Sequence, residues 1–370
     1  MKVGCLKEIK RHEYRVGMTP ACVKAYVAHG HKVVVQAGAG EGAGFPDGEY
    51  VEAGAAVEPD RKRIFADCEM IVKVKEPQPE EFPLFREGQI LFTYLHLAPD
   101  LEQTLALLKA KVKGVAYETI RLADGTLPCL KPMSEIAGRL SLQEGAKYLE
   151  KPFGGRGVLL GGVPGVPRGK VAILGGGVVG LNAAKVAVGM GAEVTILDVN
   201  AHRLAYLDDI FGGRAATLYA TDANLSRVLA ESDLVIGAVL IPGAQAPKLV
   251  RREHLKTMKR ASVIVDVAVD QGGCVETTKA TTHDDPVYVV DGVVHYGVAN
   301  MPGAVALTST LALTSTTLAY GLKIADLGLE AALKLDPALK AGLNVYQGQV
   351  TYADVARAHG LVYVAADGVI

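Results

Sequence analysis

Three features of the sequence predict an α/β fold with parallel sheets, divided between two domains. Short apolar runs alternate with helical stretches along nearly the whole chain, which is the pattern of successive βα units. The length of 370 residues exceeds what one hydrophobic core usually supports, so two domains are expected. Glycines at 175, 177 and 180 follow an apolar run and open a helical one, as in doubly wound domains.

The composition is that of an ordinary globular protein that is rich in glycine. Hydrophobic residues make up 49% of the chain and charged residues 21%, which excludes a disordered or collagen-like chain. The 39 basic residues balance the 40 acidic ones, so the net charge is -1. Such a chain has no bulk attraction for nucleic acid or an anionic membrane, and we expect neither as a partner. The balanced charge does not exclude a local basic pocket for a small anion.

Cysteine usage and the N-terminus favour a cytoplasmic protein. The five cysteines are odd in number and form no CxxC pair, which argues against a disulfide framework or a structural zinc site. The first residues, MKVGCLKEIKR, do not form a signal peptide, because charges interrupt a short apolar stretch. The apolar segment 298–322 contains Asn300, Pro302 and several Ser and Thr, so we expect a buried helix there rather than a membrane span.

In the first third of the chain, five apolar runs predict strands with helices between them. The expected strands are Lys2–Leu6, Lys32–Gln36, Met70–Val74, Ile90–Leu95 and Gly114–Tyr117. One helix should begin with Thr19 as N-cap and Pro20 at the first helical position, and end near Gly30. A second helix is expected over Asp100–Ala110.

Beyond residue 130 a long helix is expected, with Ser134 as N-cap and an end near Leu149. Segment 153–169 holds seven glycines in 17 positions, so we expect a loop; its simplest interpretation is a connector, and the sequence alone does not assign it another role. The strands expected after it are Val171–Leu174, Glu193–Leu197, Ala216–Tyr219, Leu234–Ala238, Ser262–Val267, Val287–Val290 and Leu361–Val364. The expected helices are Val178–Met190, one from near Asn200, Gly303–Tyr320 and a region after Ala325.

Residues 170–182 read KVAILGGGVVGLN and predict a dinucleotide site. Gly175 permits a tight turn, Gly177 lets the backbone approach a pyrophosphate, and Gly180 lets helix and strand pack closely. The N-terminus of the following helix offers N–H groups and the positive end of its dipole. Asp198 lies 18 residues after Gly180, where a ribose-binding carboxylate is expected, and its charge favours NAD over NADP. The alternative is a plain βαβ turn, and Arg203 could either serve a phosphate or be a solvated helix residue.

Four further polar residues stand where ligands bind in open α/β sheets. His96 ends a strand run and could exchange protons near neutral pH, or have a structural role. Asp270 closes another run and could orient or activate water, or form a turn. Lys75 and Arg15 could hold a carboxylate or ketone, or be surface charges. These residues alone do not name a substrate.

The sequence strongly resembles the alanine dehydrogenase family over essentially the whole chain. The matching stretches include KEIKRHEYRVGMTP, VKVKEP, LFTYLHLAPD, KPMSEIAGRLSLQEGA, LLGGVPGV, ILGGGVVG, VDVAVDQGG and VHYGVANMPGAVALTST. The NAD-binding subunit of proton-translocating transhydrogenase shares the architecture, but the continuous VDVAVDQGG and VANMPGAV favour the dehydrogenase. Two other interpretations stay open: a non-catalytic or membrane-coupled NAD-binding subunit, and a nucleotide-sensing or interaction protein that kept the fold but lost the chemistry.

The resemblance implies roles for individual residues. Arg15 and Lys75 match positions that bind the carboxylate and carbonyl of pyruvate. His96 and Asp270 match two acid/base positions, while Met133 and Asn300 match residues that line the substrate and nicotinamide pocket. Beside Gly175, Gly177 and Gly180, the positions that match NAD contacts are Ser134, Val178, Val179, Asp198, Arg203, Ala220, Val239, Leu240, Val267, Ala268, Val269, Asp270, Lys279, Val298, Ala299, Asn300 and Met301.

Three positions depart from the family pattern. Ala220 stands where a serine is frequent, which puts a side-chain hydrogen bond in doubt. Lys279 stands where many relatives have Arg, so that contact would be less bidentate. Some members bind a divalent metal through a glutamate and a histidine; Glu118 matches the first, but Leu327 stands at the second, so no metal is expected.

The resemblance also implies the domain plan and the reaction. A Rossmann NAD-binding domain, residues 130–305, should be inserted into a discontinuous α/β substrate domain made of residues 1–129 and 306–370. The implied activity is the reversible, NAD-dependent oxidative deamination of L-alanine to pyruvate and ammonium, as part of amino-acid catabolism. The family implies a homohexamer.

Overall fold

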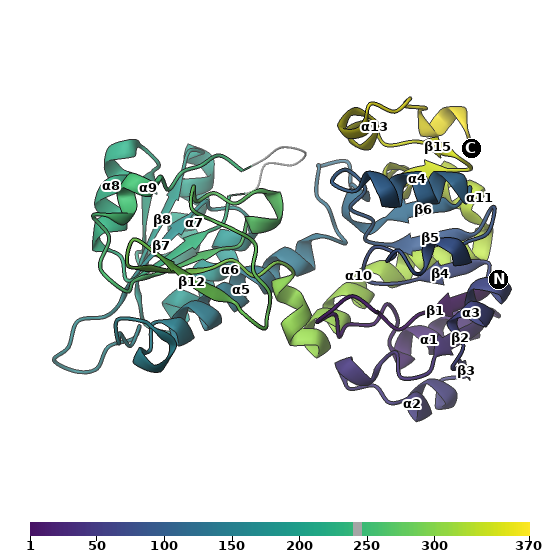
Figure 1. Cartoon of the computed structure of the whole chain (residues 1–370), viewed down its shortest axis with the longest axis horizontal. Coiled ribbons are helices and arrows are strands. Elements are labelled where there is room, and N and C mark those ends of the chain that lie inside the picture. Colours follow the sequence, from purple (N-terminus) through teal and green to yellow (C-terminus); the bar gives the residue numbers. More distant parts are fainter. Residues whose placement is uncertain (240–245) are drawn as a thin grey trace. The chain divides into compact units, whose positions relative to one another are not determined.

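The computed structural model spans residues 1–370 and describes residues 1–239 and 246–370. These residues form two compact units (Figure 1). The first unit combines Met1–Met133 with Gly303–Ile370, and the second is Ser134–Pro302. One unit is therefore built from both ends of the chain, and its limits lie close to the domain boundaries expected from the sequence.

The first unit contains an eight-stranded sheet in the order β15-β14-β6-β5-β4-β1-β2-β3. The strands are β1 (Lys2–Cys5), β2 (Lys32–Gln36), β3 (Ala56–Glu58), β4 (Met70–Val72), β5 (Ile90–Thr93), β6 (Lys113–Ala116), β14 (Leu343–Tyr346) and β15 (Gln349–Val350). Strands β1 to β6 are parallel, and β14 and β15 add an antiparallel edge. The strand order reverses between β1 and β4, and ligands of open α/β sheets bind beyond the carboxyl ends at such a point.

Eight α-helices surround this sheet in the described part of the first unit, apart from the start of α5 (Lys131–Tyr148), which continues into the second unit. They are α1 (Pro20–Ala28), α2 (Asp47–Glu52), α3 (Arg61–Asp67), α4 (Leu101–Lys109), α10 (Ala306–Leu327), α11 (Leu329–Leu335), α12 (Pro337–Ala341) and α13 (Ala353–His359). The predicted N-cap of α1 is confirmed, because the Thr19 hydroxyl accepts a hydrogen bond from the backbone N–H of Cys22. Ile64, Leu107 and Val355 carry α3, α4 and α13 into one apolar core.

Helix α10 is longer than the sequence pattern predicts. It begins at Ala306 after a 3₁₀ turn, rather than at Gly303, and continues past Tyr320 to Leu327. Among the described residues, 301–327 form one helix long and apolar enough to cross a membrane by length and composition alone. Because Thr310, Leu313 and Thr314 are buried inside the unit, we interpret α10 as a core helix.

The second unit contains a seven-stranded sheet in the order β12-β13-β11-β10-β7-β8-β9. The strands are β7 (Lys170–Leu174), β8 (Glu193–Asp198), β9 (Ala215–Tyr219), β10 (Leu234–Gly237), β11 (Val263–Asp266), β12 (Val287–Val290) and β13 (Val293–Tyr296). All are parallel except β12, which forms an antiparallel hairpin with β13. The strand order reverses between β7 and β10, so the predicted α/β class with a Rossmann-type domain is confirmed.

The helices of the second unit follow the strands as expected, with one correction at the start. They are α5 (Lys131–Tyr148), α6 (Val178–Gly189), α7 (Ala201–Phe211), α8 (Asp222–Glu231) and α9 (Arg252–Leu255). Ser134 is not the N-cap of α5, because the helix already begins at Lys131. Pro132 is tolerated there, since the first turn of a helix does not need its missing N–H.

The predicted strands differ from the observed ones in two further respects. Segment 361–364 is not a strand: Tyr363 forms only an isolated bridge to Val350, and Val362 is 81% exposed. In addition, β3, β13, β14 and β15, which are short, are not predicted from the sequence. For β13 a usable signal existed, because Asp291-Gly292, both with positive φ, form the two-residue turn typical of a hairpin.

A buried ion cluster joins the segments that follow β1 and β4. The side chain of Lys73 is fully buried and lies 3.0 Å from a carboxylate oxygen of Glu8 and 3.0 Å from one of Glu81. The other oxygen of Glu8 accepts hydrogen bonds from the backbone N–H of Val74 and Lys75, at 2.6 and 3.2 Å. Burial disfavours the charge on Lys73, but the two carboxylates outweigh it and raise the pKa of the amine.

Replacement of Lys73 by Met should destabilise the first unit. Glu8 and Glu81 would remain as buried carboxylates without their cation, which costs about 3–5 kcal/mol in free energy of unfolding. Urea denaturation followed by circular dichroism measures the change. Lys62→Met, at an exposed position, is the matched control. A Lys73→Met protein as stable as this control would contradict the importance of the cluster.

Candidate active site

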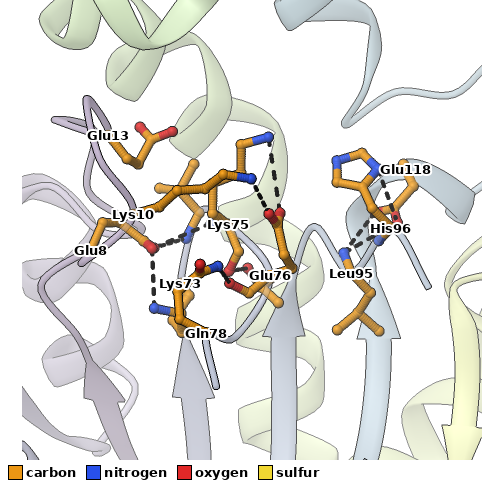
Figure 2. A network of polar contacts seen from close by, with 12 residues as sticks. Glu8, Lys10, Glu13, Lys73, Lys75, Glu76, Gln78, Leu95, His96 and Glu118 are labelled. Carbon is orange, nitrogen blue, oxygen red and sulfur yellow. Dashed lines mark hydrogen bonds and ion pairs between the residues drawn. The ribbon is translucent and has the colours of Figure 1, made fainter. Parts of the chain in front are cut away.

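The predicted residues of the first unit follow adjacent strands of its sheet. Arg15 lies in the segment after β1, Lys75 follows β4, and His96 follows β5. Strands β1 and β4 flank the position where the strand order reverses. Figure 2 shows Lys75 and His96 above the ends of neighbouring strands. The fold therefore carries these three residues to one edge of the sheet, at its expected ligand-binding position.

Arg15 is buried and is held by a neighbouring carboxylate. Its Nε and Nη2 donate to the two oxygens of Glu13, each at 2.6 Å, and its Nη1 lies 3.1 Å from the sulfur of Met133. Burial disfavours the charge on Arg15, but the hydrogen bonds and the charge of Glu13 raise its pKa. Arg15 and Met133, both predicted, are thus brought together, while the sequence analysis missed Glu13.

Lys75 is fixed through its backbone and keeps its amine in a mostly buried position. Its N–H donates to Glu8 and its carbonyl accepts from the hydroxyl of Thr93, at 3.2 and 3.0 Å. The side chain is 13% exposed, and burial lowers the pKa of the amine below its ordinary value. A buried lysine at a strand end is suited to an anionic or carbonyl ligand.

His96 has a left-handed backbone conformation, with φ of +47°, which is unusual for a residue other than glycine. The carboxylate of Glu118 accepts hydrogen bonds from the backbone N–H of Leu95 and His96, at 3.1 and 2.7 Å (Figure 2). The imidazole stacks on the ring of Tyr94 and remains 42% exposed. Because Glu118 satisfies both N–H groups, it stabilises the conformation that presents His96. Neither this function of Glu118 nor the stacking of Tyr94 is predicted from the sequence.

The second predicted acid/base residue, Asp270, belongs to the second unit. It is exposed and lies in a 3₁₀ turn, Val269–Gln271, just after β11. The buried carboxylate of Asp266 accepts from the backbone N–H of Ala268 and Val275, at 3.2 and 3.1 Å, and from the Thr278 hydroxyl at 2.6 Å. Asp266 therefore fixes the loop that carries Asp270, a function that the sequence analysis did not find.

The glycine loop between β7 and α6 has the geometry that the sequence predicts. Gly175 has φ of +99°, in the left-handed region that favours glycine. A Cβ on Gly180 would lie 1.8 Å from the carbonyl oxygen of Gly175, whereas a Cβ on Gly177 would meet nothing within 4 Å. Gly177 is the N-cap of α6 and makes no side-chain cap bond. The loop thus leaves open space at the helix N-terminus, as a pyrophosphate requires.

Asp198 and Arg203 both bind this loop. The two oxygens of Asp198 accept from the backbone N–H of Gly176 and Asn200, at 2.7 and 2.8 Å. Arg203 donates to the carbonyl oxygens of Gly176 and Gly177 and lies over the ring of Tyr206. Arg203 is therefore not a merely solvated helix residue. These residues fit the adenosine half of a dinucleotide.

Apart from Ser134 on α5, Lys279 before β12 and Leu240, the remaining predicted NAD contacts follow the carboxyl ends of parallel strands. Val178 and Val179 begin α6, Ser134 lies in the first turn of α5, Ala220 follows β9, Val239 follows β10, Val267 to Asp270 follow β11, and Val298 to Met301 follow β13. The amine of Lys279 lies over the ring of Tyr288, 4.5 Å from its centroid. Leu240 lies outside the described residues.

The structure also describes both positions of the metal site found in some family members. Glu118 accepts the backbone hydrogen bonds described above, and Leu327 is 48% exposed. Within the described residues, no group of three or more His, Cys, Asp or Glu could hold a metal ion. The absence of a metal remains a prediction.

Replacement of Asp198 by Ala should weaken NAD binding and narrow the preference for NAD over NADP. Loss of a charged hydrogen-bond acceptor for the ribose typically costs about tenfold in affinity or more. Quenching of intrinsic tyrosine fluorescence or NADH fluorescence titration measures both dissociation constants. Asp209→Ala, on the exposed face of α7, is the control. Unchanged affinities for both nucleotides would contradict the ribose-binding role.

Comparisons with known proteins place the chain in a family. The N-terminal and C-terminal domains of the family described as Alanine dehydrogenase/PNT match residues 4–137 and 141–353. Similar relatives include alanine dehydrogenases of Methanococcus maripaludis, 59% identical over 99% of both chains, and Staphylococcus haemolyticus, 56% identical over 99% of this chain and 98% of the relative.

Solved structures agree with these matches. A structure titled L-alanine dehydrogenase is 54% identical, with a TM-score of 0.95 over 97% of this chain and 99% of the other. A transhydrogenase from Sinorhizobium meliloti is 28% identical, with a TM-score of 0.81 over 95% and 99%. The resemblance seen in the sequence is thus confirmed, and the chain belongs to the alanine dehydrogenase/PNT family.

Proposed function

We propose that this protein is an alanine dehydrogenase, which catalyses the reversible, NAD-dependent oxidative deamination of L-alanine to pyruvate and ammonium. The observation that carries the proposal is the placement of Arg15, Lys75 and His96 at one edge of the sheet of the first unit. The identity of 59% to one alanine dehydrogenase, against 28% to the transhydrogenase, supports a dehydrogenase over a membrane-coupled NAD-binding subunit.

The substrate is bound through its carboxylate and polarised at C2. The guanidinium of Arg15, oriented by Glu13, binds the carboxylate through charge-assisted hydrogen bonds. The ammonium of Lys75 stabilises negative charge on the carboxylate or on the C2 oxygen of pyruvate. Met133 packs against Arg15 and contributes an apolar wall, which suits a small aliphatic substrate.

The reaction transfers one hydride and also requires the transfer of protons. The loop between β7 and α6 would hold NAD, which would supply the acceptor for the hydride that leaves Cα of the amine form of the substrate. His96, exposed on its strand-end turn, exchanges a proton with the oxygen or nitrogen at C2. Asp270 orients or activates the water that converts the imine to pyruvate and ammonium.

We further propose that the enzyme is a cytoplasmic homohexamer. All five cysteines are buried and unbridged, which supports a reducing compartment. The glycine-rich segment 153–169 contains a turn closed by a bridge between Val163 and Val166. Leu159, Val163 and Val166 are each more than half exposed there, an apolar group suited to contact between subunits.

Substitution of the two acid/base residues tests the proposed mechanism. His96→Ala and Asp270→Asn should each lower kcat for L-alanine oxidation by about 10²–10⁴-fold, because proton transfer is lost. NADH binding, measured by fluorescence titration, should stay close to that of the unchanged protein. His202→Ala and Asp209→Asn, both at exposed positions of α7, are the matched controls. Near-normal turnover in both test variants would overturn the catalytic assignment.

A further inference from the structure

A carboxylate beside Lys75 has no part in the mechanism above. Glu76 is the next residue in the chain, and its side chain is only 13% exposed. Its Oε1 accepts a hydrogen bond from the amine of Lys10, and its Oε2 lies 3.9 Å from the amine of Lys75 (Figure 2). Two cations thus converge on one carboxylate at the end of β4.

The two oxygens of Glu76 are unequal. Within the described residues, Oε2 is buried and has no hydrogen-bond partner. A separation of 3.9 Å from Lys75 allows an ion pair but exceeds hydrogen-bond distance. A buried carboxylate oxygen without a donor is costly, so this oxygen requires a nearby positive charge. In the described structure, Lys75 supplies that charge.

Lys75 depends on Glu76 in return. Burial disfavours its ammonium form most, and the charges of Arg15 and Lys10 act in the same direction. Glu76 opposes them, with a smaller contribution from Glu13. Burial likewise disfavours ionised Glu76, but Lys75 and Lys10, with a contribution from His96, lower its pKa. Of the two carboxylates that support the Lys75 ammonium, Glu76 has the stronger influence.

We propose that Glu76 is a positioning residue of the substrate site, which keeps Lys75 charged and in place to receive pyruvate, and that Lys10 competes for the same carboxylate. The inference rests on the substrate-binding role of Lys75 in the proposed function. It assigns to Glu76 and Lys10 the control of the pH range in which the enzyme binds a 2-oxo acid.

The direction of each change follows from the charges. Pyruvate binding through Lys75 is lost as the pH rises through the pKa of its amine. Glu76→Gln removes the supporting charge at nearly constant shape, so this loss should begin about one pH unit lower. Lys10→Gln removes an opposing cation and a competitor, so the loss should move to higher pH. Glu80→Gln, an exposed change in the same loop, should cause no shift.

Pyruvate binding to the enzyme–NADH complex, without ammonium, tests the proposal. NADH fluorescence gives the pyruvate dissociation constant at each pH, and melting temperatures show that the variants are folded. We expect Glu76→Gln to weaken binding about tenfold on the alkaline side with NADH affinity unchanged, and Lys10→Gln to shift in the opposite direction.

Three outcomes would overturn the inference. Pyruvate profiles identical to that of the unchanged protein would show that Glu76 does not act on Lys75. Equal weakening at every pH would show a structural role only. If Glu76→Gln fails to fold, an unshifted pyruvate-binding profile of Lys10→Gln would overturn the inference instead. Failure of the unchanged enzyme–NADH complex to bind pyruvate would instead contradict the proposed function itself.

Discussion

The paired carboxylate of Glu8 is the interaction on which the substrate side of the molecule depends. It lies where the strand order of the first sheet reverses, and there it joins the segment after β1 to the end of β4. One oxygen holds the buried amine of Lys73, while the other accepts the N–H groups of Val74 and Lys75. The backbone that carries Lys75 and Glu76 is thereby held in place at the end of β4. This arrangement costs the free energy of burying charged groups.

Carboxylates that accept hydrogen bonds also support other predicted functional residues. Glu13 holds the guanidinium of Arg15, and Glu118 holds the backbone that presents His96. In the second unit, Asp266 fixes the loop of Asp270, and Asp198 fixes the glycine loop. Carboxylates that accept two or more hydrogen bonds hold polar segments rigidly, and rigidity in the supporting residues preserves the geometry that catalysis needs.

Features that depend only on residues close together along the chain could be predicted from the sequence. Most strands of both sheets, the Thr19 cap and the Gly175–Gly180 turn follow from periodicity and from local backbone chemistry. The supporting carboxylates could not be predicted in this way, because Glu118 meets His96 only after β5 and β6 pair. Ser134 and segment 361–364 were misread, since a helix start and an edge strand depend on tertiary packing.

Oxidation of L-alanine by the purified protein tests the proposed function most directly. Incubated with L-alanine and NAD⁺ alone, it should form NADH, followed by absorbance, and an equal amount of pyruvate, with no membrane partner present. A protein that binds NAD⁺ yet forms no NADH from L-alanine would contradict the proposed function and favour an NAD-binding protein without this chemistry.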